Sequence, residues 1–297
     1  MASSLISIDT VDEIKITTLI ENQAGFGTSL LAQHGLSFLL DILSGNTQKR
    51  ILFDTGASAK PILHNMNMLG MNPKSIDMIY LSHCHYDHTT GLAEILQAID
   101  KEVPIVSHSS LFRGHYTIKP YLKNIGVSYE NRKEQIHKYK GKFIFVNTPF
   151  ALMKGVISTG EIERVTEFEE QNVSSVYTTH QGELVLDKML DDQSLVIHLK
   201  DKGLLIISGC SHAGIINIIK HSIKITGIHK IYGIIGGLHL AKADDPFIRL
   251  TADALLKIQP QLLAIGHCTG FKALCHLNKI FGDQLEPLYA GKQLHFK

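Results

Sequence analysis

The sequence predicts an α/β domain in which two β-sheets lie between layers of helices. Short apolar segments alternate with segments of helical periodicity, and hairpin-like pairs occur in each half of the chain. The 297 residues, 44% of them hydrophobic, are enough for one large domain or for a domain with an inserted cap. We expect residues 1–297 to form a single domain.

Strands are expected where short apolar runs lie between turn signals. They are 14–20, 37–42, 50–53, 77–81 and 104–106, followed by 143–146, 156–158, 195–199, 204–207, 230–235 and 262–265. The turn at 200–203 joins two of these as a hairpin. Helices are expected at 59–68, 92–99, 214–222, 247–258 and 271–281.

Two segments interrupt this alternation. Residues 108–139 are rich in Lys, Arg, Tyr and His without a clean apolar period, and we interpret them as a helical or loop-rich insertion near the site. Residues 161–190 are irregular, with acidic and polar runs and few apolar anchors. Together the two segments are expected to form the walls or lid of a substrate pocket, or one of them makes a dimer contact.

The most informative motif is the run 82–88 (SHCHYDH), directly after the strand expected at 77–81. Alternate residues of an extended segment point the same way, so His83 and His85 are placed to bind one metal ion. The following turn carries Asp87 and His88 to a second ion. Imidazole and carboxylate suit zinc, iron or manganese. A solvated, histidine-rich turn is the alternative, but four residues of metal-ligand type within six positions favour a metal site.

Two further histidines lie at expected strand ends. His212 follows the strand at 204–207 and precedes a helix, and His267 follows the strand at 262–265. We interpret both as metal ligands, with a structural histidine as the alternative for each.

The pattern His-x-His-x-Asp-His after a strand resembles the signature of the metallo-β-lactamase superfamily. Asp54 in LFDTG looks like the first motif of that superfamily, and GCSH (209–212) and IGHC (265–268) look like its later ligand motifs. GCSHAG, GGLHL (236–240) and HCTG (267–270) resemble markers of the branch around dihydropterin-ribofuranosylaminobenzene-phosphate synthase. This resemblance implies a four-layer αββα sandwich and a dinuclear metal centre.

The sequence departs from the superfamily pattern at two ligand positions. A histidine is missing near Thr159-Gly160-Glu161, where Glu161 is either an oxygen ligand or a solvated loop acid. Cys210 lies where a bridging aspartate is usual, and we interpret it as a small buried cysteine, with His212 coordinating instead.

Other polar residues are candidates for contacts with substrate. His239 follows the strand at 230–235 and is interpreted as a substrate contact, a metal contact or a structural residue. Asn22 and Thr269 are candidate pocket residues, with solvated loops as the alternative. Arg113 and Lys119, in the insertion, would suit an anionic substrate with a planar group, unless they belong to an ordinary solvated surface.

The main functional prediction is metal-dependent hydrolysis of a small, anionic, phosphorylated substrate. A water held between two divalent ions, most simply zinc, attacks an ester, phosphoester or amide, and Asp87 orients the nucleophile or carries a proton. The first alternative, implied by the branch, is transfer: the metals activate a diphosphate leaving group on a pterin while an arylamine-type carbon attacks. The second alternative is a non-catalytic ligand-binding or sensing protein.

Composition limits the partners and the location. The formal charge is +1, from 29 Lys and Arg and 28 Asp and Glu, so no strong field attracts nucleic acid or an anionic membrane. The four cysteines form no disulfide-scaffold pattern, and three of them lie within two residues of proposed ligand histidines, which favours a reducing compartment. With no signal-peptide pattern at the N-terminus, we expect a cytoplasmic protein, and a homo-oligomer is compatible with the sequence.

Overall fold

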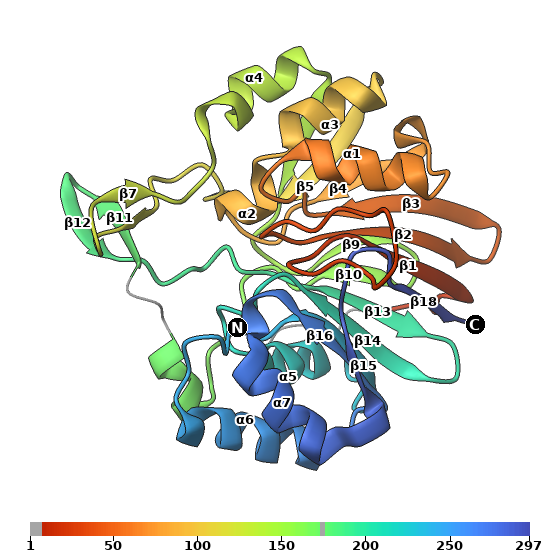
Figure 1. Cartoon of the computed structure of the whole chain (residues 1–297), viewed down its shortest axis with the longest axis vertical. Coiled ribbons are helices and arrows are strands. Elements are labelled where there is room, and N and C mark those ends of the chain that lie inside the picture. Colours follow the sequence, from red (N-terminus) through yellow and green to blue (C-terminus); the bar gives the residue numbers. More distant parts are fainter. Residues whose placement is uncertain (1–7, 173–175) are drawn as a thin grey trace.

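The computed structural model describes residues 8–172 and 176–297. Two seven-stranded sheets pack face to face, and helices cover the outer face of each sheet (Figure 1). This arrangement of helices, sheet, sheet and helices confirms the predicted fold class.

The first sheet is formed mainly by the N-terminal half of the chain. Its outer helices are α1 (Ala59–Met68) and α3 (Leu92–Ile99), which lie side by side over it (Figure 1). An antiparallel meander, β1 to β3, continues into parallel strands β4, β5 and β8, while the C-terminal strand β18 pairs with β1. In sheet order its strands are β18 (Gln293–Phe296), β1 (Glu13–Ile20), β2 (Ser37–Ser44), β3 (Thr47–Phe53), β4 (Met78–Tyr80), β5 (Val103–Ser107) and β8 (Gly141–Phe145).

The second sheet belongs to the C-terminal half. Helices α5 (Ile215–Thr226), α6 (Asp245–Ile258) and α7 (Phe271–Phe281) cover it. Strands β14 to β17 are parallel, so their carboxyl ends meet at one edge. In sheet order its strands are β17 (Leu285–Pro287), β16 (Leu262–Gly266), β15 (Ile231–Gly237), β14 (Gly203–Ser208), β13 (Leu195–Leu199), β10 (Val156–Ser158) and β9 (Phe150–Met153).

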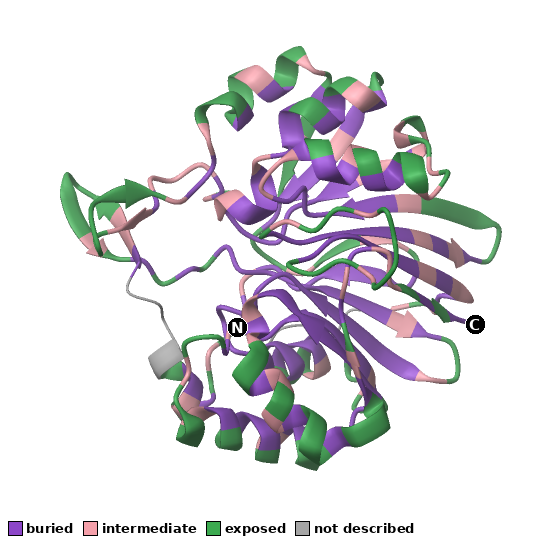
Figure 2. Ribbon diagram, viewed as in Figure 1, coloured by how far each residue is buried: buried purple, intermediate pink, exposed green. Residues whose placement is uncertain are grey.

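Three apolar layers hold the sandwich together. One lies between the sheets, where Phe38, Phe53 and Ile207 are fully buried. The other two lie between each sheet and its helices, around Leu39 and Leu96 on one side and around Ile218 and Leu263 on the other. Buried residues accordingly run through the middle of both sheets, while the outer faces of the helices are exposed (Figure 2).

The two segments that interrupt the sequence pattern meet in a third sheet, which we call the flap. Its strands are β12 (Glu183–Leu186), β11 (Val176–His180), β6 (Tyr116–Thr117) and β7 (Lys123–Asn124). The flap projects from one end of the sandwich (Figure 1). The insertion is therefore partly β-structure, where we expected helix or loop, although it also contains the short helix α4 (Lys133–Lys138). These strands are two to five residues long and have little buried apolar surface, which explains why no periodicity marks them.

No helix within the described part of the chain is long and apolar enough to cross a membrane.

Candidate metal centre

Histidines from both sheets converge where the carboxyl ends of their strands meet. His83 Nε2 lies 3.0 Å from His85 Nδ1, and His212 Nε2 lies 3.1 Å from the same His85 nitrogen. His83 and His85 follow β4, whereas His212 follows β14 in the other sheet. We call these three residues the trihistidine group. Their nitrogens all lie within 4.8 Å of one another, close enough to share one ion.

A second set of ligand atoms lies beside the first. His88 Nε2 is 3.2 Å from His267 Nε2, and Asp87 Oδ2 is 3.3 Å from His267 Nε2 and 3.7 Å from His88 Nε2. Asp87 and His88 are on the short helix α2 (Tyr86–Thr89), and His267 follows β16. We call Asp87, His88 and His267 the mixed group. The structure thus brings together all six residues interpreted from the sequence as principal ligands.

Cys210 lies between the two groups. Its Sγ is 3.2 Å from His88 Nε2 and, with His83 and His88, forms a set of ligand atoms within 4.8 Å. The side chain is buried, as expected for a small structural cysteine, but its sulfur is also placed as a ligand would be. Thiolate sulfur is a good ligand for zinc and for iron. The position of Cys210 therefore makes it a candidate metal ligand as well as the buried structural cysteine that the sequence suggested.

The outer nitrogens of His83, His88 and His267, which point away from the centre, are each held by a neighbour. The hydroxyl of Ser82 donates to Asp54 Oδ2 at 2.7 Å, so it accepts from His83 Nδ1 at 2.8 Å. His88 Nδ1 donates to Asp54 Oδ2 at 2.6 Å, and His267 Nδ1 lies 3.1 Å from Asn22 Oδ1, an acceptor. His83 and His267 therefore carry the proton on the outer nitrogen and direct a lone pair inward, whereas the outer Nδ1 of His212 is buried without a hydrogen-bond partner. Asn22, a candidate for contact with substrate, instead orients a ligand.

These residues fit a divalent cation. In the trihistidine group the inward-facing nitrogens lie about 3 Å apart in a buried place, and lone pairs so close repel one another unless a cation lies between them. Burial lowers the pKa of His83 and His212 well below the usual value, and that of His85 to about 3. All three imidazoles are therefore neutral at pH 7, which is the form that binds metal.

The mixed group is more polar. Burial disfavours a charge on His88, but the carboxylates of Asp87 and Asp54 outweigh burial and raise the His88 pKa to about 9. Burial likewise opposes ionisation of Asp87, yet His88 and His267 hold its pKa well below the usual range. A negative charge is thus fixed beside the inward-facing nitrogens of this group, which favours a cation there.

His34 is a member of the site that the sequence analysis missed. Its Nε2 is 3.2 Å from Asp87 Oδ2, and its ring stacks on that of His267 with a centroid separation of 5.3 Å. With 56% of the side chain exposed, His34 lies at the solvent side of the mixed group. It belongs to the loop between β1 and β2, which has no strand-end motif to mark it.

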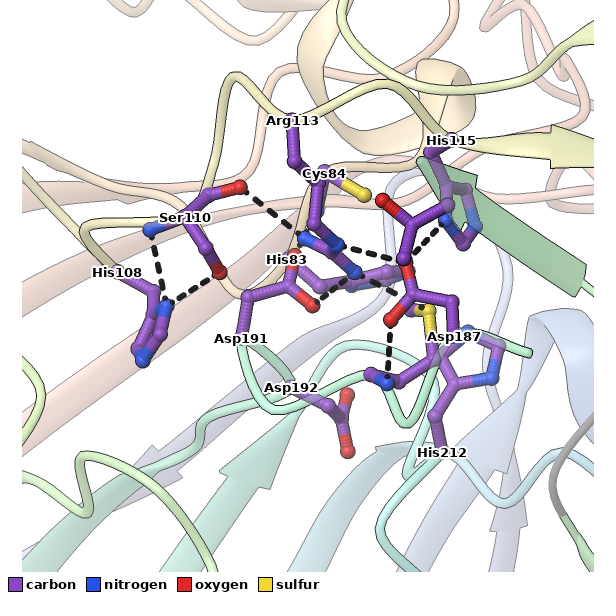
Figure 3. A network of polar contacts seen from close by, with 12 residues as sticks. His83, Cys84, His108, Ser110, Arg113, His115, Asp187, Asp191, Asp192 and His212 are labelled. Atoms are coloured by element: carbon purple, nitrogen blue, oxygen red, sulfur yellow. Dashed lines mark hydrogen bonds and ion pairs between the residues drawn. The ribbon is translucent and has the colours of Figure 1, made fainter. Parts of the chain in front are cut away.

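Figure 3 shows a network of charged residues on the flap side of the trihistidine group. Arg113 donates to Asp187 at 2.6 Å and to Asp191 at 2.7 Å, and His115 Nδ1 lies 2.8 Å from Asp187 Oδ2. The Arg113 side chain is only 16% exposed, because two carboxylates surround it. The guanidinium thus already pairs with two buried carboxylates, and its interpretation as a contact for an anionic substrate stays a prediction. Lys119 is exposed in the turn between β6 and β7.

The remaining candidates lie outside the two groups. Glu161 accepts from His108 Nε2 at 3.1 Å and from Asn147 at 3.2 Å, and it belongs to none of the ligand sets found among the described residues. The ring of His239 lies beside that of His212, tilted by 53° with centroids 4.1 Å apart, and His239 forms a further set of ligand atoms with Cys210 and Cys268. Thr269 is buried and accepts from the backbone of Leu238, which is a structural role.

Relatives of known sequence extend over the whole chain. A 7,8-dihydropterin-6-methyl-4-(β-D-ribofuranosyl)-aminobenzene-5'-phosphate synthase of Methanocaldococcus jannaschii is 45% identical over 294 residues, which cover 98% of this chain and 100% of the relative. An uncharacterized protein of the same organism is 32% identical over 265 residues, 89% of this chain and 94% of that protein. The family model described as anti-Pycsar protein Apyc1 matches residues 25–107, less than half of the chain.

Solved structures share the fold. A metal-dependent hydrolase of the β-lactamase superfamily superposes with a TM-score of 0.77 at 25% identity, covering 95% of this chain and 98% of that one. The metallo-β-lactamase fold protein YhfI from Bacillus subtilis gives a TM-score of 0.55 at 14% identity, covering 96% and 100%. Folds of this kind support the binding of divalent metal by the clustered residues.

The comparison with the synthase overturns the main functional prediction. We expected a hydrolase, whereas a relative 45% identical over the full length is a synthase, which favours the transfer alternative. The motifs GCSHAG, GGLHL and HCTG had indicated this branch. The chain therefore belongs to the metallo-β-lactamase superfamily, in the enzyme branch of dihydropterin-ribofuranosylaminobenzene-phosphate synthase.

Proposed function

We propose that this protein is a metal-dependent synthase that joins a 7,8-dihydropterin to 4-(β-D-ribofuranosyl)aminobenzene 5'-phosphate. The observation that carries the proposal is the 45% identity to the Methanocaldococcus jannaschii synthase, which leaves almost no part of either chain unmatched. The clustered ligands support the metal dependence.

The reaction is a substitution at the methyl carbon attached to the pterin ring. The bond from this carbon to a diphosphate oxygen breaks, and the diphosphate leaves with the bonding electrons. A bond forms from the arylamine nitrogen, in place of the attacking carbon expected from the sequence, to the same methyl carbon, and that nitrogen loses a proton. We propose that the trihistidine and mixed groups hold two divalent ions. Zinc is the preferred metal, with iron or manganese as alternatives. When bound, these ions supply the positive charge that stabilises the departing diphosphate.

Residues of the chain itself define where the reacting groups lie. Asp87 is ionised and contacts both His267 and His34, so it fixes the two rings that line the solvent side of the mixed group. Through these contacts Asp87 is placed to orient groups at this site. His34 is the exposed member of the set and is placed to contact an anion that enters from solvent.

The test is to incubate the metal-loaded protein with a dihydropterin that carries a diphosphate on its 6-methyl carbon, with and without the arylamine phosphate. Mass spectrometry should find the coupled product, formed in equal amount to the released diphosphate and only when both substrates are present. Release of diphosphate or phosphate at the same rate without the arylamine would contradict the synthase assignment. Asp87→Ala protein is the negative control, since it should form no product.

A further inference from the structure

The flap contacts a metal ligand directly. His85 directs Nδ1 into the trihistidine group, while its Nε2 lies 2.8 Å from Nε2 of His115, a fully buried residue just before β6. On its other side, His115 Nδ1 lies 2.8 Å from Asp187 Oδ2, and Asp187 follows β12. A continuous chain of contacts thus runs from His85 to the residues that directly flank two strands of the flap, β6 and β12.

These contacts determine which nitrogen of each ring carries the proton. Asp187 also accepts from Arg113, at 2.6 Å, so its carboxylate acts only as an acceptor and His115 must donate from Nδ1. Neutral His115 then has its lone pair on Nε2, which accepts from Nε2–H of His85. The proton of His85 is thereby fixed on Nε2, and its Nδ1 is left free to bind metal.

The backbone holds His115 firmly in this position. Its carbonyl accepts from the N–H of Ile125, and the carbonyl of Ile125 accepts from the N–H of Tyr86, the residue after the ligand, each at 2.9 Å. Asp187 is fixed by its contact with Arg113 and by the backbone N–H of Met189, which donates to its other oxygen at 2.8 Å. The flap and the ligand turn therefore form one connected unit.

We propose that His115, held by Asp187, is a positioning residue for His85. The flap then supports the metal centre through the residues that flank its strands. His115 sets the tautomer and the ring orientation of the ligand and binds neither metal nor substrate. This inference rests on the metal binding in the proposed function and not on the identity of the substrates.

The test compares three variants of the full-length protein. His115→Phe keeps a ring but removes the acceptor, and His115→Gln restores an acceptor near the position of Nε2. His108→Phe is the matched control, because His108 is also a buried histidine of the insertion, pairs with the carboxylate of Glu161, and belongs to none of the ligand sets found among the described residues. For each protein, competition with a chromophoric chelator measures affinity for Zn²⁺, and the absorption spectrum of the Co²⁺-loaded form reports the ligand geometry.

We expect His115→Phe to weaken Zn²⁺ binding by about 10- to 100-fold and to change the Co²⁺ spectrum, as loss of such a partner typically does. His115→Gln should recover most of the loss, and His108→Phe should match the wild type. Wild-type affinity in His115→Phe would overturn the inference, and so would equal losses in all three variants, which would indicate packing alone. Wild-type protein that binds no divalent ion would instead overturn the metal-dependent function as well.

A measurement on the unmodified protein covers the case in which His115→Phe does not fold. Long-range ¹H–¹⁵N correlation spectra of the metal-free wild type distinguish histidine tautomers. His115 should carry its proton on Nδ1 and His85 on Nε2. The reverse tautomer at either residue would overturn the inference.

Discussion

The ligand residues of the N-terminal half and those of the C-terminal half meet in one site but are supported in different ways. The N-terminal half supplies His83, His85, Asp87 and His88 from one turn, whereas the C-terminal half supplies His212 and His267 singly, each from its own strand end. A turn of consecutive ligands needs only local geometry. Ligands from separate strands need the two sheets to be in register and the backbone to bend sharply after each strand.

The hydrogen bonds reflect this difference. Asp54, at the end of β3, accepts from the backbone and hydroxyl of Ser82 and from His88, so one buried carboxylate fixes both ends of the N-terminal turn. His267 has a left-handed backbone, with φ of 53°, and is held from the opposite sheet by Glu21 and Asn22 after β1. The C-terminal ligands thus depend on contacts between the sheets.

Removal of one ligand from each group should have the largest effect. His83→Ala should lose the ion of the trihistidine group, and His267→Ala that of the mixed group, so each should fall from about two bound ions to about one. Both should lower turnover on the order of 10³-fold, because a metal ion contributes several kcal/mol of charge stabilisation. Elemental analysis and turnover assays measure the two effects.

Circular dichroism should show that both variants keep the wild-type fold, since the ligands lie on strand-end loops. His295→Ala, which changes an exposed histidine paired with Glu13, is the control and should retain metal and turnover. Loss of both ions from His267→Ala but only one from His83→Ala would show that the two groups are not independent.

The same difference in support explains how much of the site was predictable. His83, His85, Asp87 and His88 form a local motif after an apolar run, and His212 and His267 follow strands that the sequence marks clearly. His34, His115 and Asp187 lie in segments without periodicity and reach the centre only through tertiary packing. The flap strands were missed for the same reason, while the apolar strands and helices of the sandwich carry enough periodicity to be recognised.

A smaller effect, on the free energy of unfolding, is expected when the ion-pair network of Arg113 with Asp187 and Asp191 is disrupted. Arg113→Met should lower the free energy of unfolding by about 3–5 kcal/mol, because it leaves the buried carboxylates of Asp187 and Asp191 without their cation. Urea denaturation at pH 7 measures this loss. Equal stability of wild type and variant would show that the network contributes nothing to the fold.

The pH dependence of that loss has a definite sign. Burial opposes ionisation of Asp191, but Arg113 outweighs it and lowers its pKa below the ordinary value of 3.8. A carboxyl whose pKa is lower in the folded state stabilises the fold above its unfolded pKa, and this contribution is lost as the pH falls through the folded value. The difference between wild type and Arg113→Met should therefore shrink below about pH 4.

The smallest effect should come from Lys119, an exposed charged residue of the flap. Its side chain is exposed in the β6–β7 turn, where water and salt screen a single charge. Lys119→Gln should raise KM for the arylamine phosphate by about two- to fivefold at low salt, leave kcat unchanged, and lose this effect at high salt. Lys138→Gln, on α4, removes a similarly exposed charge outside the flap strands and should leave KM unchanged. A much larger rise in KM for Lys119→Gln, independent of salt, would mean that the flap closes over the substrate and desolvates this lysine. In that case the flap would recognise the substrate as well as support the metal centre.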